Sequence, residues 1–139
     1  MSGLLLDTNV ISELTRPAPA PPVLAFLAER HDLWLSVLAL HELEFGLLLL
    51  PRGRRQAELR DVLAEFVRRY EDRILPVGRR AAGQAARLRA DARGEGRTLD
   101  LGDALIAGTA QAHALGVATR NVADFEGLGL GLTNPWDFL

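Results

Sequence analysis

The sequence predicts an α/β domain with a mainly parallel central sheet of about five strands and helices on both faces. Short apolar runs alternate with longer segments of helical periodicity, which is typical of this class. The first run, residues 3–6, is apolar throughout, as expected of a strand that is covered on both faces. A length of 139 residues suits one domain, which we expect to span residues 1–139.

The first third of the chain predicts two strand–helix units. The strand over residues 3–6 ends at Asp7, and a helix begins near Thr8 and is broken by a proline-rich stretch that ends at Pro22. Since proline suits a first helical turn, a second helix is expected over residues 23–30. A strand over residues 33–36 and a helix over 38–50 follow. The apolar residues of this helix nearly encircle it, which predicts that it is well buried.

The next segments are mainly helical. Apolar residues at spacings of three and four predict an amphipathic helix between residues 52 and 73. A strand is expected over residues 74–77, and a helix over 79–93 that Gly94 and Gly96 end.

The last third completes the alternation. An alanine-rich helix is expected to begin at Asp100 or Leu101 and to run to about Leu115. A strand over residues 117–119, a helical turn from Val122 and a short strand over residues 130–132 follow.

Composition excludes several kinds of chemistry. All 16 basic residues are arginine, so the chain has neither a P-loop lysine nor a Schiff-base lysine. Without cysteine it cannot use a thiolate nucleophile or a cysteine zinc site. The pair His41-Glu42 begins like a metalloprotease signature, but Phe45 stands where the second histidine is required.

The N-terminus and the apolar runs predict a protein of the cytoplasm without a membrane span. Asp7 interrupts the leucines that precede it, so no signal peptide is expected. The purely apolar runs are far shorter than the ~18 residues of a membrane helix.

Four acidic residues fall where the predicted elements allow a common site. Asp7 ends the first strand, Glu42 lies in an apolar helix, Asp103 is in a first helical turn, and Asp124 follows the fourth strand. Ligands of parallel α/β sheets bind beyond the carboxyl ends of the strands. Oxygen ligands there suit Mg²⁺ or Mn²⁺, which can assist phosphodiester hydrolysis.

A structural interpretation of the same acids stays open. Asp7 could cap the helix that follows it, and Asp100 with Asp103, like Asn121 with Asp124, has the spacing of a capping pair. Glu42 is harder to explain in this way, because an ionised glutamate among leucines needs a partner or a ligand.

The residues around these acids resemble the four motifs of PIN-domain ribonucleases, and more closely the VapC toxins of bacterial toxin–antitoxin pairs. The resemblance runs to the Asn134-Pro135-Trp136 tail and covers nearly the whole chain. It is carried by residues 4–14, 36–46, 103–107 and 119–125.

The resemblance implies a metal-dependent endoribonuclease that hydrolyses tRNA or ribosomal RNA. It implies that Asp7, Glu42, Asp103 and Asp124 bind Mg²⁺ or Mn²⁺, and it favours Glu42 over Glu44 because the family's acid lies four residues before a glycine, here Gly46. It further implies a homodimer that is inhibited by a cognate VapB-like antitoxin whose C-terminal segment covers the cleft.

Four further residues have supporting roles or roles that stay open. The resemblance implies that Asn9 and Thr119 support the site by hydrogen bonds. Arg120 could contact an RNA phosphate or form an internal salt bridge. Asp100 is expected to be a helix cap, with the rim of the site as the other possibility.

Two other functions are alternatives. One is a catalytically inactive PIN fold that binds proteins, although all four acids are present. The other is a small phosphotransfer or nucleotide-binding domain, which the missing lysine and the absence of a glycine-rich phosphate loop disfavour.

The net charge of −2 conceals a strong division along the chain. Residues 52–97 hold 13 arginines against seven acids, a local charge of +6, whereas the rest of the chain has three arginines and 11 acids. The arginine-rich segment could hold a phosphate backbone, or its side chains could simply solvate helix faces.

Overall fold

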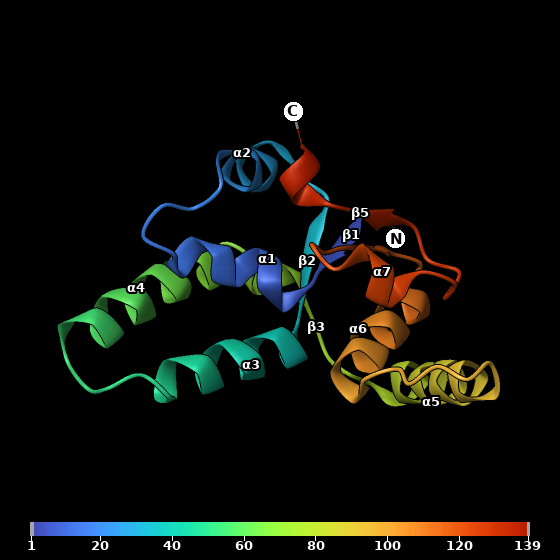
Figure 1. Cartoon of the computed structure of the whole chain (residues 1–139). Coiled ribbons are helices and arrows are strands. Elements are labelled where there is room, and N and C mark those ends of the chain that lie inside the picture. The colour runs from blue at the N-terminus through green and yellow to red at the C-terminus, as the bar shows by residue number, and fades with distance from the viewer. Residues whose placement is uncertain (1, 139) are drawn as a thin grey trace.

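A computed structural model describes residues 2–138. Strands and helices alternate around a central sheet (Figure 1). The strands are β1 (Leu4–Leu6), β2 (Leu33–Ser36), β3 (Ile74–Leu75), β4 (Gly116–Ala118) and β5 (Leu132–Thr133). The helices are α1 (Thr8–Ser12), α2 (Pro21–Glu29), α3 (Val37–Leu48), α4 (Arg54–Arg68), α5 (Arg79–Gly94), α6 (Leu101–Ala112) and α7 (Val122–Phe125).

The sheet has five parallel strands within residues 2–138, in the order β3-β2-β1-β4-β5. The α/β class, the parallel pairing and the number of strands are therefore confirmed. The strand order reverses between β1 and β4, which are neighbours in the sheet. In such sheets the crevice at the reversal point is the usual ligand site, so the topology places Asp7 and Thr119 there.

Helices cover both faces of the sheet, because successive strand residues point to opposite sides. Leu4 and Leu6 of β1 contribute to a core with α1, α2, α3 and α4. Leu5, between them, points to the other core, which α5, α6 and α7 cover. In Figure 1 these two groups of helices lie on either side of the central strands.

The prediction that α3 is buried all round is wrong. Its buried residues form one stripe, Ala39, Leu43 and Leu47, which packs against the first core. Phe45 and Leu48 are instead exposed. Helical periodicity alone could not reveal this, since an apolar side chain on the outer face gives the same pattern as a buried one.

Several element bounds also differ from the predictions. The amphipathic helix α4 ends at Arg68 because a separate helical turn, Glu71–Arg73, leads into β3. The alanine-rich helix α6 ends at Ala112, where Ala114 takes a positive φ of 55° and turns the chain toward β4. The last strand pairs with β4 through Leu132 and Thr133, slightly later than expected. No helix within the described chain is long and apolar enough to cross a membrane.

Candidate active site

Asp7 lies at the end of β1 and is the most buried of the four predicted acids, with 9% of its surface exposed. It is the N-cap of α1, where its Oδ1 accepts a 2.8 Å hydrogen bond from the Thr8 amide. Asp7 therefore does cap the helix that follows it, as the structural interpretation of this acid predicts. The other carboxylate oxygen is turned toward β4, so the cap leaves it available for a further role.

Thr119 and Asn9 hold this second oxygen. Thr119 Oγ1 donates a 2.8 Å hydrogen bond to Asp7 Oδ2, and Asn9 Nδ2 donates a longer one of 3.3 Å. Asn9 also accepts from the Arg120 amide at 3.3 Å, which ties α1 to the end of β4. The side chains that surround Asp7 thus fix its orientation from two directions.

Burial raises the pKa of Asp7, and the hydrogen bonds from Thr119 and Thr8 oppose this rise. The nearby Asp124 carboxylate raises the same pKa further. Asp7 and Asp124 are therefore close enough to repel each other although they lie in separate elements.

Asp103 is the residue on which the charges of the other acids converge. It lies in the first turn of α6, and the described chain contains no hydrogen-bond partner for its side chain. Burial raises the pKa of Asp103 to about 6, with further contributions from four carboxylates. These carboxylates are Asp7, Asp100, Asp124 and Glu42.

Glu42 lies in the second turn of α3 and reaches the same region. Burial is the main cause that raises its pKa, and the negative charge of Asp7 adds to it. Glu44, two residues on, faces elsewhere and forms a 2.9 Å ion pair with Arg60 of α4. Of these two glutamates, only Glu42 therefore belongs to the group of Asp7, Glu42, Asp103 and Asp124, which we call the acidic cluster.

Asp100 is the N-cap of α6, since its Oδ2 accepts a 3.1 Å hydrogen bond from the Gly102 amide. It also lies close to Glu42: a β-carbon at Gly102 would be 3.2 Å from Asp100 Oδ2 and 3.7 Å from Glu42 Oε1. The two interpretations of Asp100 are thus not exclusive, because the cap sits at the rim of the acidic cluster.

Asp124 is exposed in the first turn of the short helix α7. The expected partner in a capping pair, Asn121, makes no side-chain cap bond there. The capping interpretation of Asp124 therefore has no contact to support it.

Arg120 follows Thr119 and is exposed, with its guanidinium 5.0 Å from the centre of the Trp136 ring. No ion pair within residues 2–138 includes it. The internal salt bridge that the sequence left open is therefore not formed, and a cation–π contact holds this side chain instead.

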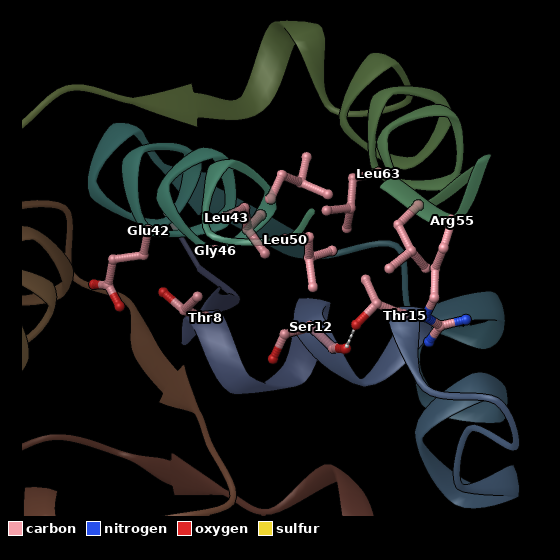
Figure 2. Close-up of a pocket in the computed structure, with 11 residues that line it drawn as sticks. Thr8, Ser12, Thr15, Glu42, Leu43, Gly46, Leu50, Arg55 and Leu63 are labelled. Atoms are coloured by element: carbon pink, nitrogen blue, oxygen red, sulfur yellow. Dashed lines mark hydrogen bonds between the residues drawn. The ribbon is translucent and has the colours of Figure 1, made fainter. Parts of the chain in front are cut away.

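Thr8 is a site residue that the sequence did not single out. Its hydroxyl is buried, Figure 2 shows it directed toward the Glu42 carboxylate, and this contact opposes the rise in the pKa of Glu42. The available signal was its position, directly after the acid that ends a strand. A hydroxyl in this place adds an oxygen donor to the acidic cluster.

A groove opens from Glu42 between α1, α3 and α4 (Figure 2). Its volume is about 450 Å³, and its other end is marked by Arg55. Five leucines form most of its apolar wall, namely Leu43, Leu47, Leu50, Leu59 and Leu63. The acidic cluster is thus continuous with an apolar channel.

The acidic side chains lie around one common space, but they are not drawn together at its centre. Within residues 2–138, no three histidine or acidic side chains lie close enough together to hold a metal ion as they stand. All donors around the space are nevertheless oxygens, and their repulsion adds to burial in raising the pKa of Asp103. This is the donor chemistry that a hard divalent cation prefers, so the residues fit such an ion.

The family model of the PIN domain matches residues 4–127. The chain is 39% identical over 137 residues to "VapC ribonuclease Y4jK" of Sinorhizobium fredii, a match that covers 96% of this chain and 98% of that protein. It is 37% identical over 136 residues to "Toxin FitB" of Neisseria gonorrhoeae, with 96% and 98% covered.

Solved structures agree with this family. The fold superposes with a TM-score of 0.90 on FitAcB from Neisseria gonorrhoeae, at 36% identity and with 99% of this chain and 100% of that chain covered. A toxin–antitoxin complex from Klebsiella pneumoniae matches with a TM-score of 0.68 at 25% identity, covering 95% and 97%. The family model, the curated relatives and the fold all agree, and the chain belongs to the PIN-domain family.

Proposed function

We propose that this protein is a metal-dependent endoribonuclease that acts as the toxin of a toxin–antitoxin pair. The observation that carries the proposal is the convergence of acids from separate elements on Asp103, whose pKa burial and, after it, these charges raise to about 6. A fold does not favour such repulsion unless something compensates for it. Relatives that are named a ribonuclease and a toxin support the same function.

Four carboxylates would hold the cation, and Thr8 adds a neutral oxygen beside them. When bound, Mg²⁺ or Mn²⁺ acts as a Lewis acid that activates water and stabilises negative charge on the phosphodiester. The proposed ligands are Asp7, Glu42, Asp103 and Asp124.

The protein's own residues orient this set. Thr119 and Asn9 donate to Asp7 and orient it, and the bond from Thr119 opposes the rise in its pKa that burial causes. Asp7 and Thr119 follow neighbouring strands, so the rigid sheet fixes one side of the site. Glu42 and Asp103 extend from α3 and α6, which pack on opposite faces of the sheet. The acids therefore meet only when both layers are assembled.

The substrate is RNA, since residues 79–97, with six arginines against two acids, supply positive charge beside a strongly negative site. We expect cleavage in tRNA or ribosomal RNA and action in the cytoplasm, where these RNAs occur. Mapping cleavage ends across total RNA identifies the target.

The apolar groove beside Glu42 is the proposed seat of a VapB-like antitoxin. Its leucine wall suits an apolar peptide segment, while Glu42 at one end and Arg55 at the other offer opposite charges. A peptide in this groove would cover the acidic cluster and inhibit the enzyme. The toxin–antitoxin complex among the solved neighbours supports such a partner.

The outer stripe of α3 supports a homodimer. Val37, Phe45, Leu48 and Leu49 are between 40% and 69% exposed, and the His41 ring stacks on Phe45. These positions recur at helical spacing on one side of α3, away from its buried stripe. A second copy of the chain would cover this surface.

A matched pair of glutamates on α3 tests the nuclease directly. Glu42→Gln removes a proposed ligand, whereas Glu44→Gln removes an exposed acid paired with Arg60. Antitoxin-free wild-type protein and Glu44→Gln should cleave RNA with Mg²⁺ or Mn²⁺ and stop in EDTA. Glu42→Gln should lose cleavage in both metals. Cleavage that persists in EDTA contradicts the metal mechanism, and a folded protein that binds its partner without cleaving RNA is an inactive PIN fold.

A further inference from the structure

An arginine-lined depression lies outside the acidic cluster. It has a volume of about 590 Å³ and forms at the end of α5 and the segment that leads into α6. Its lining residues are Arg89, Ala90, Arg93, Arg97, Thr98 and Leu99. Three guanidinium groups and one hydroxyl therefore share a surface without an acidic residue.

At this end of α5, the helix places two arginines and two acidic residues on different faces. Arg89 and Arg93 are four residues apart and share one face. The acids of the same region, Asp91 and Glu95, line a different depression together with Arg87, and Arg97 borders both depressions. The positive charge on the first face is thus not offset by its own helix.

The three arginines also lack ion-pair partners elsewhere. The salt bridges within the described chain involve other arginines, and Arg89 and Arg93 are exposed. Arg97 Nη1 donates a 3.1 Å hydrogen bond to the Glu126 carbonyl, which orients its guanidinium. Like charges at a spacing of four residues are unfavourable for a helix unless an anion binds between them.

The depression adjoins the acidic cluster along the chain. Leu99 is buried in its wall and is followed by Asp100, which raises the pKa of Asp103. At about 3.3–3.6 Å per extended residue, at most about 11 Å separates the Cα atoms of Arg97 and Asp100. A nucleic-acid strand held here would thus reach the acids within a few nucleotides.

We infer that Arg89, Arg93 and Arg97 form a phosphate-binding subsite that holds the RNA backbone beside the cleavage site. This inference rests on the proposed nuclease function. Arginine suits the role because its planar fork can donate two parallel hydrogen bonds to one phosphate. The Thr98 hydroxyl adds a neutral donor. Such contacts position a strand without reading its bases, so the subsite serves affinity and register.

The test compares two double variants with the same change of charge. Arg89→Gln/Arg93→Gln alters the subsite, and glutamine keeps good helix propensity at these exposed positions. Arg52→Gln/Arg54→Gln is the control, because both residues are exposed. Arg54 begins α4 and Arg52 lies just before it, on the other side of the sheet from α5 (Figure 1). Binding of a fluorescent single-stranded RNA is measured in EDTA over a range of salt concentrations, and steady-state cleavage is measured with Mn²⁺.

The subsite variant should bind this RNA about tenfold more weakly, and its salt dependence should fall by about one to two charges, at about 0.7 per phosphate contact. Its KM should rise while kcat stays close to the wild-type value. Arg52→Gln/Arg54→Gln should change little in either measurement. Arg89→Lys/Arg93→Lys should keep the salt dependence and recover only part of the affinity.

Two results would overturn the subsite alone. If wild-type protein cleaves RNA and the subsite variant equals it in affinity, salt dependence and KM, the arginines do not hold the strand. An equal loss in the control would show that overall charge, and not this depression, attracts RNA. Wild-type protein that neither binds nor cleaves RNA would instead refute the proposed function.

Discussion

Thr119 Oγ1 donates a fully buried hydrogen bond of 2.8 Å to Asp7 Oδ2 and so connects the carboxyl ends of β4 and β1. The strands themselves are joined by backbone hydrogen bonds, including that from the Asp7 amide to the Ala118 carbonyl. The side-chain bond adds a fixed orientation to a carboxylate whose burial favours protonation.

Thr119→Val should therefore lower metal-dependent RNA cleavage by about 10- to 100-fold while the protein stays folded. Valine has nearly the same shape but cannot donate to Asp7, so the carboxylate loses its orientation and its pKa rises further. The free energy of unfolding should fall by about 1–3 kcal/mol, measured by urea denaturation.

Thr109→Val is the matched control for this prediction. Thr109 is equally buried, but its hydroxyl donates to the Leu105 carbonyl of its own helix at 2.7 Å. This variant should lose some stability and keep cleavage. Equal loss of cleavage in both variants would mean that stability, and not the Asp7 contact, limits activity.

Asp103→Asn should stabilise the metal-free protein at neutral pH although it removes activity. The folded pKa of about 6 is above the ordinary aspartate pKa of 3.8, so the folded state binds the proton more tightly than the unfolded state. Stability from this group is therefore fully present below pH 3.8 and is lost as the pH rises to about 6. After allowance for solvent screening, the gain in the variant should be about 1 kcal/mol at pH 7.

Thermal melts in EDTA across pH 4–7.5 test the role of Asp103. The wild-type melting temperature should rise toward pH 4 relative to that of Asp103→Asn, and Mn²⁺ should stabilise the wild type more than the variant. Parallel pH profiles of the two proteins would refute the electrostatic role of Asp103.

Asp100 allows its two roles to be separated by two substitutions. Asp100→Asn keeps an oxygen that can accept from the Gly102 amide, whereas Asp100→Ala removes the cap. Only the alanine variant should lose about 1 kcal/mol of unfolding free energy. Both should weaken Mn²⁺ binding a few-fold in calorimetry, because both remove the charge near Glu42 and Asp103. Unchanged Mn²⁺ affinity in both variants would reduce Asp100 to a cap.

The sequence was sufficient for the parts of the fold that repeat a simple pattern. An all-apolar run predicts β1 and places Asp7 at its end, and β2 lies where the sequence predicts a strand, over residues 33–36. The order β3-β2-β1-β4-β5 was beyond sequence reasoning, because pairing between β1 and β4 depends on contacts across more than 100 residues. It is this pairing that brings Thr119 to Asp7.

The sequence could not show which side of a helix faces the core and which side faces solvent. A run of leucines predicted that α3 is buried, but only the packed structure shows which side faces solvent. The burial of Glu13 is a second feature that the sequence did not predict. It is 6% exposed and binds the Ala20 amide and Arg16, so it stabilises the turn before α2 outside the acidic cluster.

Phe45→Glu should convert a dimer into a monomer, because it places a charge in the exposed apolar stripe of α3. Leu24→Glu is the control, since Leu24 of α2 is also exposed, at 42%, but lies outside the stripe. Light scattering after gel filtration should give dimer mass for wild type and Leu24→Glu and monomer mass for Phe45→Glu. A monomeric wild-type protein at micromolar concentration would contradict the proposed dimer.

Two glycines test how closely α5 and α6 pack. A β-carbon at Gly108 of α6 would lie 2.5 Å from the Ala81 carbonyl oxygen and 2.8 Å from the Ala85 amide nitrogen, both backbone atoms of α5. At Gly83 of α5, a β-carbon would meet nothing within 4 Å. Alanine has the better helix propensity, so Gly83→Ala should raise the free energy of unfolding by about 0.5–1 kcal/mol.

At Gly108 the cost of overpacking should exceed the gain in helix propensity. Gly108→Ala should therefore lower the free energy of unfolding by about 1–3 kcal/mol. Since α6 carries Asp103 and Asp100, any shift of this helix also moves two acids of the site. Cleavage should therefore fall in Gly108→Ala and stay unchanged in Gly83→Ala. Opposite signs in stability, measured by urea denaturation, would establish that direct backbone contact fixes α6 on α5, whereas a gain in both variants would contradict it.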